Sequence, residues 1–178
     1  MGSARRVYWD ACAWIALIQD EKIVVGGTIE ARGTMCRAVI EAAKKGVIEI
    51  LTSTLNLVEV CKSNKATVDK IAAFFENDYV LLVNVDRQVG ERGRELMNLG
   101  YSGLKPPDAV HLATAAVSPD VEEMHTFDDR LLKLDGLIDK ADGTKLKICK
   151  PEAGVSSAPL LEAMRGKNQT SDPPSETG

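Results

Sequence analysis

Residues 6–17 read RVYWDACAWIAL, and this stretch decides the class of fold. Residues 6–9 include β-branched and aromatic side chains, which favours a short strand. Residues 11–17 are mostly small and apolar, which suits a buried helix. Asp10 stands between the two segments. The stretch therefore predicts a strand, then an acid, then a helix.

The same alternation continues along the chain. Further strands are expected over residues 47–51, 79–83, 123–127 and 145–149. Helices are expected from a cap at Thr28 to Gly46, from Ser53 or Thr54 through Glu59, through residues 68–75, from a cap at Asp86 over residues 87–99, from Asp108 onward, and over residues 130–134. Alternating strands and helices imply a mostly parallel sheet that is covered on both faces. The predicted fold class is therefore α/β, as a three-layer α/β/α sandwich.

The composition fits one ordinary globular domain. The chain has 178 residues, of which 44% are hydrophobic and 27% are charged. We expect this domain to span residues 1–150, and we expect a mobile tail over residues 151–178, which are rich in Pro, Ser, Gly and Ala. No apolar run approaches the ~20 residues that a membrane span needs. Four scattered cysteines, Cys12, Cys36, Cys61 and Cys149, are interpreted as reduced thiols of a cytoplasmic protein.

Charge and histidine content argue against several classes of function. The formal net charge of −4 gives no bulk attraction to polyanions, which counts against a simple electrostatic binder of nucleic acid. The excess amounts to only four acids, because 26 acidic residues face 22 basic ones. Only two histidines are present, and no Cys/His cluster has zinc spacing, so neither a zinc hydrolase nor a Ser-His-Asp enzyme is well supported.

Four carboxylates lie where one predicted element gives way to the next: Asp10, Glu59, Asp108 and Asp128. Ligand sites of open parallel sheets form outside the carboxyl ends of the strands, so these acids can converge although they are far apart in sequence. Clustered carboxylates need a cation to compensate their charge, and oxygen-only ligands select hard ions such as Mg²⁺ or Mn²⁺. Such a site lowers the pKa of bound water and stabilises charge on a phosphodiester, so phosphodiester hydrolysis is its natural chemistry.

These acids stand in segments that resemble the motifs of a known family. VYWDACAWIAL resembles the opening motif of PIN-domain ribonucleases, and STLNLVEV resembles their Ser-x5-Glu segment. PPDAVHLATAA is similar to their Asp-Ala-x-x-x-Ala-x-Ala helix, and HTFDDRLL is similar to their closing Thr-x-Asp motif. The order and spacing of all four fit over about residues 6–150.

The resemblance implies roles for individual residues. Asp10, Glu59, Asp108 and Asp128 would be the catalytic acids and the ligands of Mg²⁺ or Mn²⁺, Thr126 would contact a water or a metal-bound water, and Asp129 would be an accessory acid. The family implies a metal-dependent endoribonuclease that acts on RNA. Its members are often the toxin of a bacterial VapC-type toxin–antitoxin pair, with an antitoxin protein as partner, and are often homodimers. The chain departs from the family where Ala11 and Cys12 follow Asp10, because many members carry Ser or Thr there.

Each residue also has a simpler interpretation. Asp10 and Asp108 suit helix N-caps, and Asp128 or Asp129 can cap the short helix that follows. His111 is interpreted as a packed helix residue, and Trp9 and Trp14 as core. A set of cations is interpreted as solvated more readily than as phosphate-binding: Lys62, Lys65, Arg87, Arg92 and Arg94.

Two other functions also stay open. One is a catalytically idle PIN-like module that binds RNA or protein. The other is a metal-dependent phosphoryl-transfer enzyme that acts on a small phosphorylated substrate, since a fold alone does not fix the substrate.

Overall fold

A parallel sheet of five strands forms the centre of the structure, a computed structural model that describes residues 4–60 and 71–154. The strands lie in the order β5-β4-β1-β6-β7, and every neighbouring pair is parallel. Their bounds are β1 (Arg5–Trp9), β4 (Ile48–Ser53), β5 (Val80–Val83), β6 (Val121–His125) and β7 (Lys147–Cys149). This arrangement confirms the predicted α/β class with a mostly parallel sheet.

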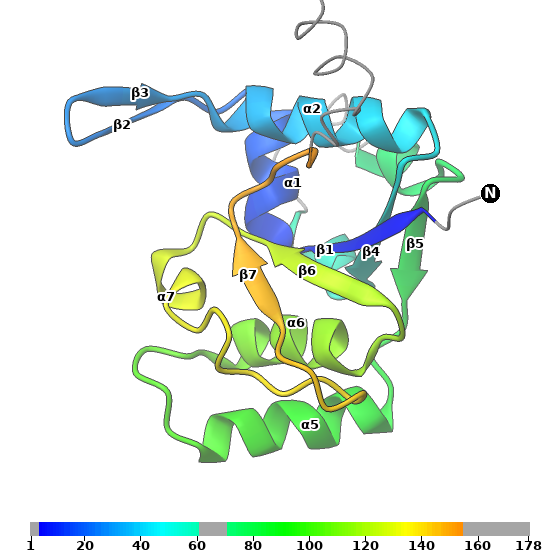
Figure 1. The fold of residues 1–178 in the computed structure, drawn as a ribbon, viewed down its shortest axis with the longest axis vertical. Helices are drawn as coiled ribbons and strands as arrows, with labels where there is room; N and C mark the ends of the chain where they lie inside the picture. The colour runs from blue at the N-terminus through cyan, green and yellow to red at the C-terminus, as the bar shows by residue number, and fades with distance from the viewer. Residues whose placement is uncertain (1–3, 61–70, 155–178) are drawn as a thin grey trace, which may run out of the picture.

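Helices cover both faces of this sheet (Figure 1). Helices α1 (Ala11–Ile18) and α2 (Arg32–Lys44) pack together on one face, and α5 (Arg87–Asn98) and α6 (Pro106–Val117) pack together on the other. Two short helices, α3 (Asn56–Glu59) and α7 (Asp129–Leu132), follow β4 and β6. The predicted three-layer sandwich is therefore confirmed.

Strand β1 shows why the opening stretch forms the middle of the sheet. Its side chains alternate between the two faces, so Val7 and Trp9 belong to the core under α1 and α2, while Tyr8 belongs to the core under α5 and α6. All three side chains are buried, as expected for a strand that is covered on both faces. Trp14 of α1 is also buried, which confirms that both tryptophans are core residues.

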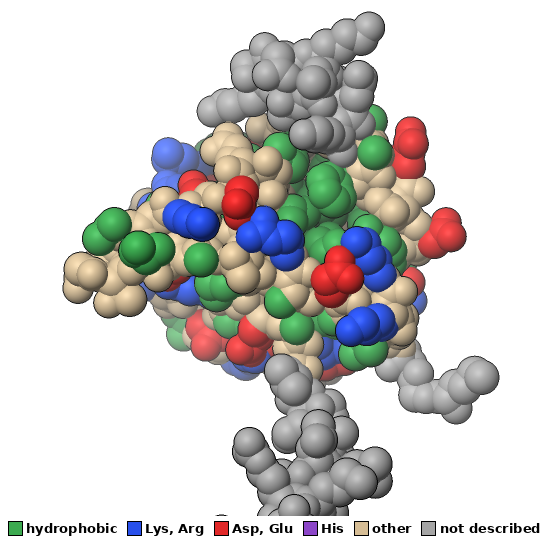
Figure 2. Space-filling model, turned by 90° about the horizontal axis from the view of Figure 1, so that it is seen from above, with side chains coloured by type: hydrophobic (Ala, Val, Ile, Leu, Met, Phe, Trp, Pro, Cys, Tyr) green, Lys and Arg blue, Asp and Glu red, His purple; other side chains and the backbone are tan. Residues whose placement is uncertain are grey.

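A two-stranded hairpin was not predicted. Strands β2 (Ile23–Val25) and β3 (Thr28–Glu30) pair antiparallel and project from the body of the molecule beyond one end of α2 (Figure 1). The prediction that Thr28 caps a helix is therefore wrong, because α2 begins at Arg32. Hydrophobic side chains gather on the projecting hairpin (Figure 2), where Val24 is 72% and Ile29 is 69% exposed.

Two other predicted element starts differ from the structure. Helix α6 begins at Pro106, so Asp108 is its third residue and not its first; prolines are tolerated in the first turn because no backbone N–H is needed there. Ser53 does not cap α3, and its hydroxyl accepts a hydrogen bond from the Leu55 N–H instead, at 2.9 Å. The Asp86 cap of α5 is confirmed, since its side chain accepts from the Val89 N–H.

Some predictions fall partly outside the described residues. Of the helix expected over residues 68–75, only residues 71–75 are described, and they are helical. Most of the expected tail also lies outside, although the Glu152 carbonyl accepts a hydrogen bond from Arg5 at 3.0 Å. Cys12, Cys36 and Cys149 are free thiols, whereas Cys61 lies outside the described range. None of the helices in the described part of the chain has the length and apolar character needed to span a bilayer.

Candidate active site

Asp10 lies where β1 ends and α1 begins. It caps α1, because one carboxylate oxygen accepts from the Ala13 N–H at 3.1 Å. The other oxygen accepts from the Thr126 hydroxyl at 2.5 Å. The side chain is buried, with a residue exposure of 2%. Asp10 therefore meets the capping interpretation and also makes a contact with the neighbouring strand that capping does not require.

Thr126 connects this carboxylate to the loop that carries Asp128. It directly follows β6, which is the neighbour of β1, so both Asp10 and Thr126 stand at the carboxyl edge of the sheet. The Thr126 hydroxyl oxygen accepts from the Asp128 N–H at 3.0 Å, and Asp128 in turn caps α7 by accepting from the Arg130 N–H at 2.8 Å. Asp129 is exposed at the start of α7, so it is the neighbouring acid that does not serve as the cap.

Arg130 brings a positive charge onto two of the acids. Its guanidinium pairs with both oxygens of Asp128, with Nε at 3.0 Å from Oδ1, and its Nη2 lies 3.6 Å from Oδ2 of Asp108. The ion pair with Arg130 lowers the pKa of Asp128. Asp108 also accepts from the Lys105 N–H at 3.2 Å, as an acid at the start of a helix can. Arg130 was not identified from the sequence.

Glu59 ends α3 and contacts a residue that was interpreted only as packing. Its Oε2 lies 2.6 Å from Nε2 of His111, and Nδ1 of His111 lies 2.7 Å from the hydroxyl of Tyr8. His111 is buried in α6, as expected, but it also joins the acidic site. Its position one helical turn after Asp108 was the available signal, because residues three apart share a helix face.

The charges of all four predicted acids act on the thiol of Cys12. Its pKa is raised to about 12, mainly by burial, and the charges of Asp10, Asp128, Asp108 and Glu59 contribute to this rise. Contacts link acids from four separate parts of the sequence near the start of α1. Thr126 joins Asp10 to Asp128, and Arg130 joins Asp128 to Asp108. Glu59 is held by His111, from the helix that carries Asp108. Cys12 stands inside this group, at a position where the family often has a hydroxyl.

The donor set fits a hard divalent cation. It consists of carboxylate oxygens, which Mg²⁺ and Mn²⁺ prefer. The pKa of Asp10 is raised to about 6, because burial and, less, the charge of Asp128 outweigh the lowering by His111, Thr126 and the Ala13 N–H. A buried carboxylate with a raised pKa is one whose negative charge is not fully compensated, and a cation bound beside it would compensate that charge.

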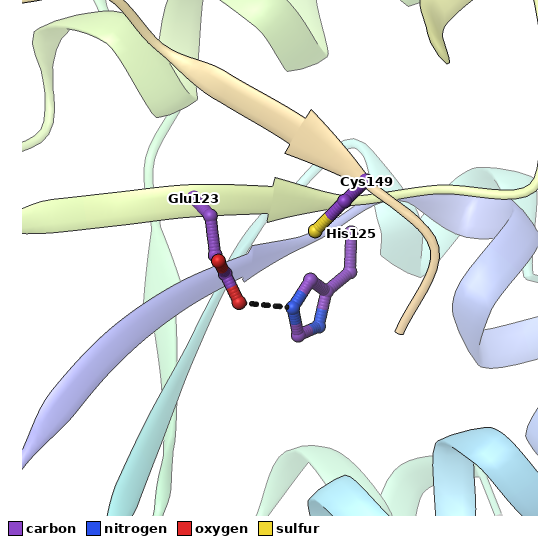
Figure 3. Close-up of side chains that lie close together, drawn as sticks. All are labelled: Glu123, His125 and Cys149. Atoms are coloured by element: carbon purple, nitrogen blue, oxygen red, sulfur yellow. Dashed lines mark hydrogen bonds and ion pairs between the residues drawn. The ribbon is translucent and has the colours of Figure 1, made fainter. Parts of the chain in front are cut away.

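A second group of potential ligands lies on the neighbouring strands β6 and β7 (Figure 3). Within residues 4–60 and 71–154, Glu123, His125 and Cys149 are the three side chains whose ligand atoms lie within 4.8 Å of one another. Sulfur, nitrogen and oxygen donors of this kind suit zinc. Both nitrogens of His125 are already engaged, however: Nδ1 accepts from the Trp9 indole N–H at 3.0 Å, and Nε2 bonds Glu123 at 2.7 Å.

The other two members of this second group are also not arranged as metal ligands. Glu123 pairs with Arg5 at 3.1 Å and with Lys147 at 2.7 Å, so its charge is compensated by two cations. Burial raises the pKa of Cys149 to about 12, so in the metal-free protein it is a thiol. The Trp9 N–H leaves the ring proton of His125 on Nε2, where it is donated to Glu123. The group is thus a buried hydrogen-bonded network that joins β1, β6 and β7.

Two of the five cations considered for phosphate contact form ion pairs with acids of their own helix. Arg87 pairs with Glu91 at 2.8 Å, and Arg92 pairs with Glu95 at 2.9 Å, both along the surface of α5. Arg94 is exposed on the same helix, and Lys62 and Lys65 fall in the part of the chain that is not described. These pairs agree with the interpretation of α5 as a solvated face.

Comparison with known proteins identifies the family. The family model described as the PIN domain matches residues 7–137. Among solved structures, the chain is similar to VapC20 of Mycobacterium tuberculosis, described as a sarcin–ricin loop cleaving toxin, with a TM-score of 0.51 and 18% identity over 69% of this chain and 90% of that one. No curated protein matches the chain. Because the family model spans well over half of the sequence, including all four acids, this chain belongs to the PIN domain family.

Proposed function

We propose that this chain is a metal-dependent endoribonuclease that hydrolyses RNA phosphodiester bonds. The observation that carries the proposal is a set of contacts that links the four acids. Asp10, Asp128 and Asp108 are joined through Thr126 and Arg130, and Glu59 is bonded to His111 on the helix of Asp108. Membership of the PIN domain family supports a nuclease, and the similar fold of a toxin described as cleaving the sarcin–ricin loop supports RNA as the substrate.

The four acids would hold Mg²⁺ or Mn²⁺. When bound, such an ion polarises a phosphodiester and lowers the pKa of water in its shell. Asp10 is kept in place by the Thr126 hydroxyl and the Ala13 N–H, so its carboxylate has one fixed orientation. The Thr126 hydroxyl also fixes the backbone of Asp128. Asp129, which is exposed beside them, is left as an accessory acid that faces the solvent side of the site.

Partners follow from the same proposal. A PIN nuclease of this kind would act as the toxin of a toxin–antitoxin pair, with an antitoxin protein that covers the acidic site, and would assemble as a homodimer. Support comes from the family and from the fold shared with VapC20, a toxin. Co-purification of the chain with the product of an adjacent gene, and the mass of the purified protein in solution, would test these two partners.

The first experiment is cleavage of an RNA panel by the parent protein and by Asp10→Asn, with Mg²⁺, Mn²⁺ or EDTA. The panel includes structured and single-stranded RNAs and a hairpin that carries the sarcin–ricin loop, and a generic phosphate ester is assayed beside it. We expect metal-dependent cutting of RNA by the parent, loss of cutting in EDTA, and a loss of at least ~100-fold in the variant, because a ligand acid supports the charge that develops in the reaction.

Asp86→Asn is the matched control. Asp86 caps α5 as Asp10 caps α1, with acceptor distances of 2.9 and 3.1 Å. Asn is as good a helix cap as Asp, so both variants keep their helices and only Asp10→Asn removes a charge from the site. Equal cutting by both variants would refute the site. A folded parent that cuts no RNA would favour an idle binding module, and turnover of the phosphate ester alone would favour a different phosphoryl-transfer enzyme.

A further inference from the structure

Glu59 is held differently from the other acids. Asp10, Asp108 and Asp128 each accept a hydrogen bond from a backbone N–H at the start of a helix. Glu59 stands at the end of the four-residue helix α3, and its side chain is 27% exposed. Its carboxylate is bonded to a side chain from the other side of the fold, Nε2 of His111 at 2.6 Å.

The hydrogen bonds around His111 define which ring nitrogen carries the proton. A carboxylate can only accept, so the short contact with Glu59 places the proton of a neutral His111 on Nε2. Nδ1 then accepts from the hydroxyl of Tyr8 at 2.7 Å. The phenol hydroxyl has a proton to donate, so Tyr8, His111 and Glu59 form one directed chain of hydrogen bonds.

Burial makes this chain of contacts rigid. Tyr8 is fully buried in the central strand, and the His111 side chain is only 4% exposed. Tyr8 cannot move without disturbing β1. The ring of His111, on α6, is bonded at both nitrogens, to Glu59 and to Tyr8. A ring that is held in this way also fixes the orientation of the carboxylate it bonds, as the hydrogen-bond partners of metal ligands do.

We infer that His111 is a positioning residue for Glu59, with Tyr8 as its anchor. The inference rests on the proposed function in one respect: the Glu59 carboxylate that is positioned is taken as part of a divalent-cation site. His111 itself contacts neither the cation nor RNA. Its role is to keep one carboxylate oxygen of Glu59 occupied and to direct the carboxylate toward the other acids.

The first test reads the tautomer directly. The chain contains two histidines, so a ¹⁵N-labelled sample at pH 8 gives two imidazole signals that can be assigned with His111→Gln. We expect the proton on Nε2 of His111. His125, which accepts from Trp9 at Nδ1 and bonds Glu123 at Nε2, should show the same tautomer and serves as an internal reference. A proton on Nδ1 of His111 would overturn the inference, because Nε2 would then have nothing to donate to Glu59.

The second test measures Mn²⁺ affinity by calorimetry in the absence of RNA. His111→Leu removes the donor and should weaken binding by about 10- to 100-fold, the usual effect of losing an outer partner of a metal ligand. His111→Gln keeps an N–H donor in a similar place and should recover most of the affinity. Tyr8→Phe, which removes only the anchor, should lie between the parent and His111→Leu.

The control variant is Ser118→Ala, which removes a buried hydroxyl at the other end of α6, where it bonds the Thr114 carbonyl at 2.6 Å. It should cost stability without changing Mn²⁺ affinity. Equal affinity for the parent and a folded His111→Leu would overturn the inference, and so would equal losses in His111→Leu and His111→Gln. A parent that binds no Mn²⁺ would refute the proposed function, while the tautomer would still decide whether His111 holds Glu59.

Discussion

Asp10 makes the stability of the metal-free protein depend on pH. Its pKa is raised by burial to about 6, above the ordinary value of 3.8, so the folded state holds a proton that the unfolded state has already released between these two values. The contribution of Asp10 to the free energy of unfolding is therefore fully present below pH 3.8 and is lost as the pH rises through about 6. In EDTA, Asp10→Asn should be more stable than the parent at pH 8 by about 1–3 kcal/mol, and the two should converge at pH 4.

Urea denaturation of both proteins at pH 4, 6 and 8 checks this prediction. Asp86→Asn is again the control, because its carboxylate is exposed at the start of α5 and it should not become more stable than the parent at pH 8. A gap between the parent and Asp10→Asn that does not widen with pH would show that the buried charge at this position is already compensated in the metal-free protein.

Arg130 supplies part of the compensation that a metal would otherwise provide. Its guanidinium pairs with Asp128 and lies 3.6 Å from Asp108, so a cation that binds both acids has to displace it. Arg130→Gln should therefore bind Mn²⁺ more tightly, by about fivefold, a modest effect because the ion pair is partly exposed and screened by solvent. Arg92→Gln, which removes a surface pair on α5, should leave the affinity unchanged. Weaker binding by Arg130→Gln would show that Arg130 supports the site instead of competing for it.

The sequence predicted the four acids but not the side chains that hold them. Each acid stands in its own short motif next to a change of element, and the carboxyl edge of a parallel sheet brings such positions together. Arg130 and Tyr8 carry no signal of their own, and His111 has only its place one turn after Asp108. The contact that each makes lies between elements, and only the packed structure defines it. Whether the acids bind metal and catalyse stays a prediction.

At the scale of the elements, strands β1, β6 and β7 are joined by the network of Glu123 and His125. Burial alone would raise the pKa of Glu123, but hydrogen bonds from His125 and Lys147 and the charge of Arg5 lower it to about 2. Because this pKa is lowered on folding, the contribution of Glu123 to the free energy of unfolding is fully present above pH 4.5. It is lost as the pH falls through about 2. Glu123→Gln should thus be less stable than the parent by about 2–3 kcal/mol at pH 7, and this difference should shrink toward pH 2.

The measurement is acid-dependent unfolding of the two proteins, followed by far-UV circular dichroism in urea. Glu49→Gln is a suitable comparison, because Glu49 pairs with Arg6 on the neighbouring part of β1 but its side chain is 26% exposed, so its loss should cost little. A constant difference between the parent and Glu123→Gln from pH 7 to pH 2 would mean that the charge of Glu123 does not stabilise the sheet edge.

Helices and strands could be predicted from the sequence where their buried side chains recur periodically. They could not be predicted where a turn determines which kind of element forms. The hairpin shows the reason. Within residues 23–30, three β-branched residues precede Gly26 and Gly27 and two follow them, and the φ angles of these glycines, +55° and +83°, suit a two-residue hairpin turn. Thr28 follows this turn signal, but its side chain also suits a helix cap, and these two signals predict different elements. Helix α6 begins two residues before its predicted start for a similar reason: Asp108 suits the start of a helix, and so do the two prolines before it.

The whole molecule places its acidic site between two separate cores. One core lies under α1 and α2 and includes Trp9 and Trp14, and the other lies under α5 and α6 and includes Tyr8 and Leu112. Asp10 belongs to the first layer through α1, while Asp108 and His111 belong to α6 on the opposite face. A cation bound by all four acids would therefore bridge both layers of helices through the carboxyl edge of the sheet.

This bridging predicts that Mn²⁺ stabilises the whole fold and not one loop. Binding to the folded state alone adds about 2.7 kcal/mol at a concentration 100 times the Kd, which corresponds to a rise of about 5–10 °C in Tm for a domain of this size. The rise should be the same when unfolding is followed by tryptophan fluorescence, which reports the first core, and by far-UV circular dichroism, which reports all layers. Asp10→Asn should show little rise, and Asp86→Asn should match the parent. If Mn²⁺ leaves the parent Tm unchanged, the acids form no cation site, and the chain is a PIN-domain protein that works by binding and not by cutting.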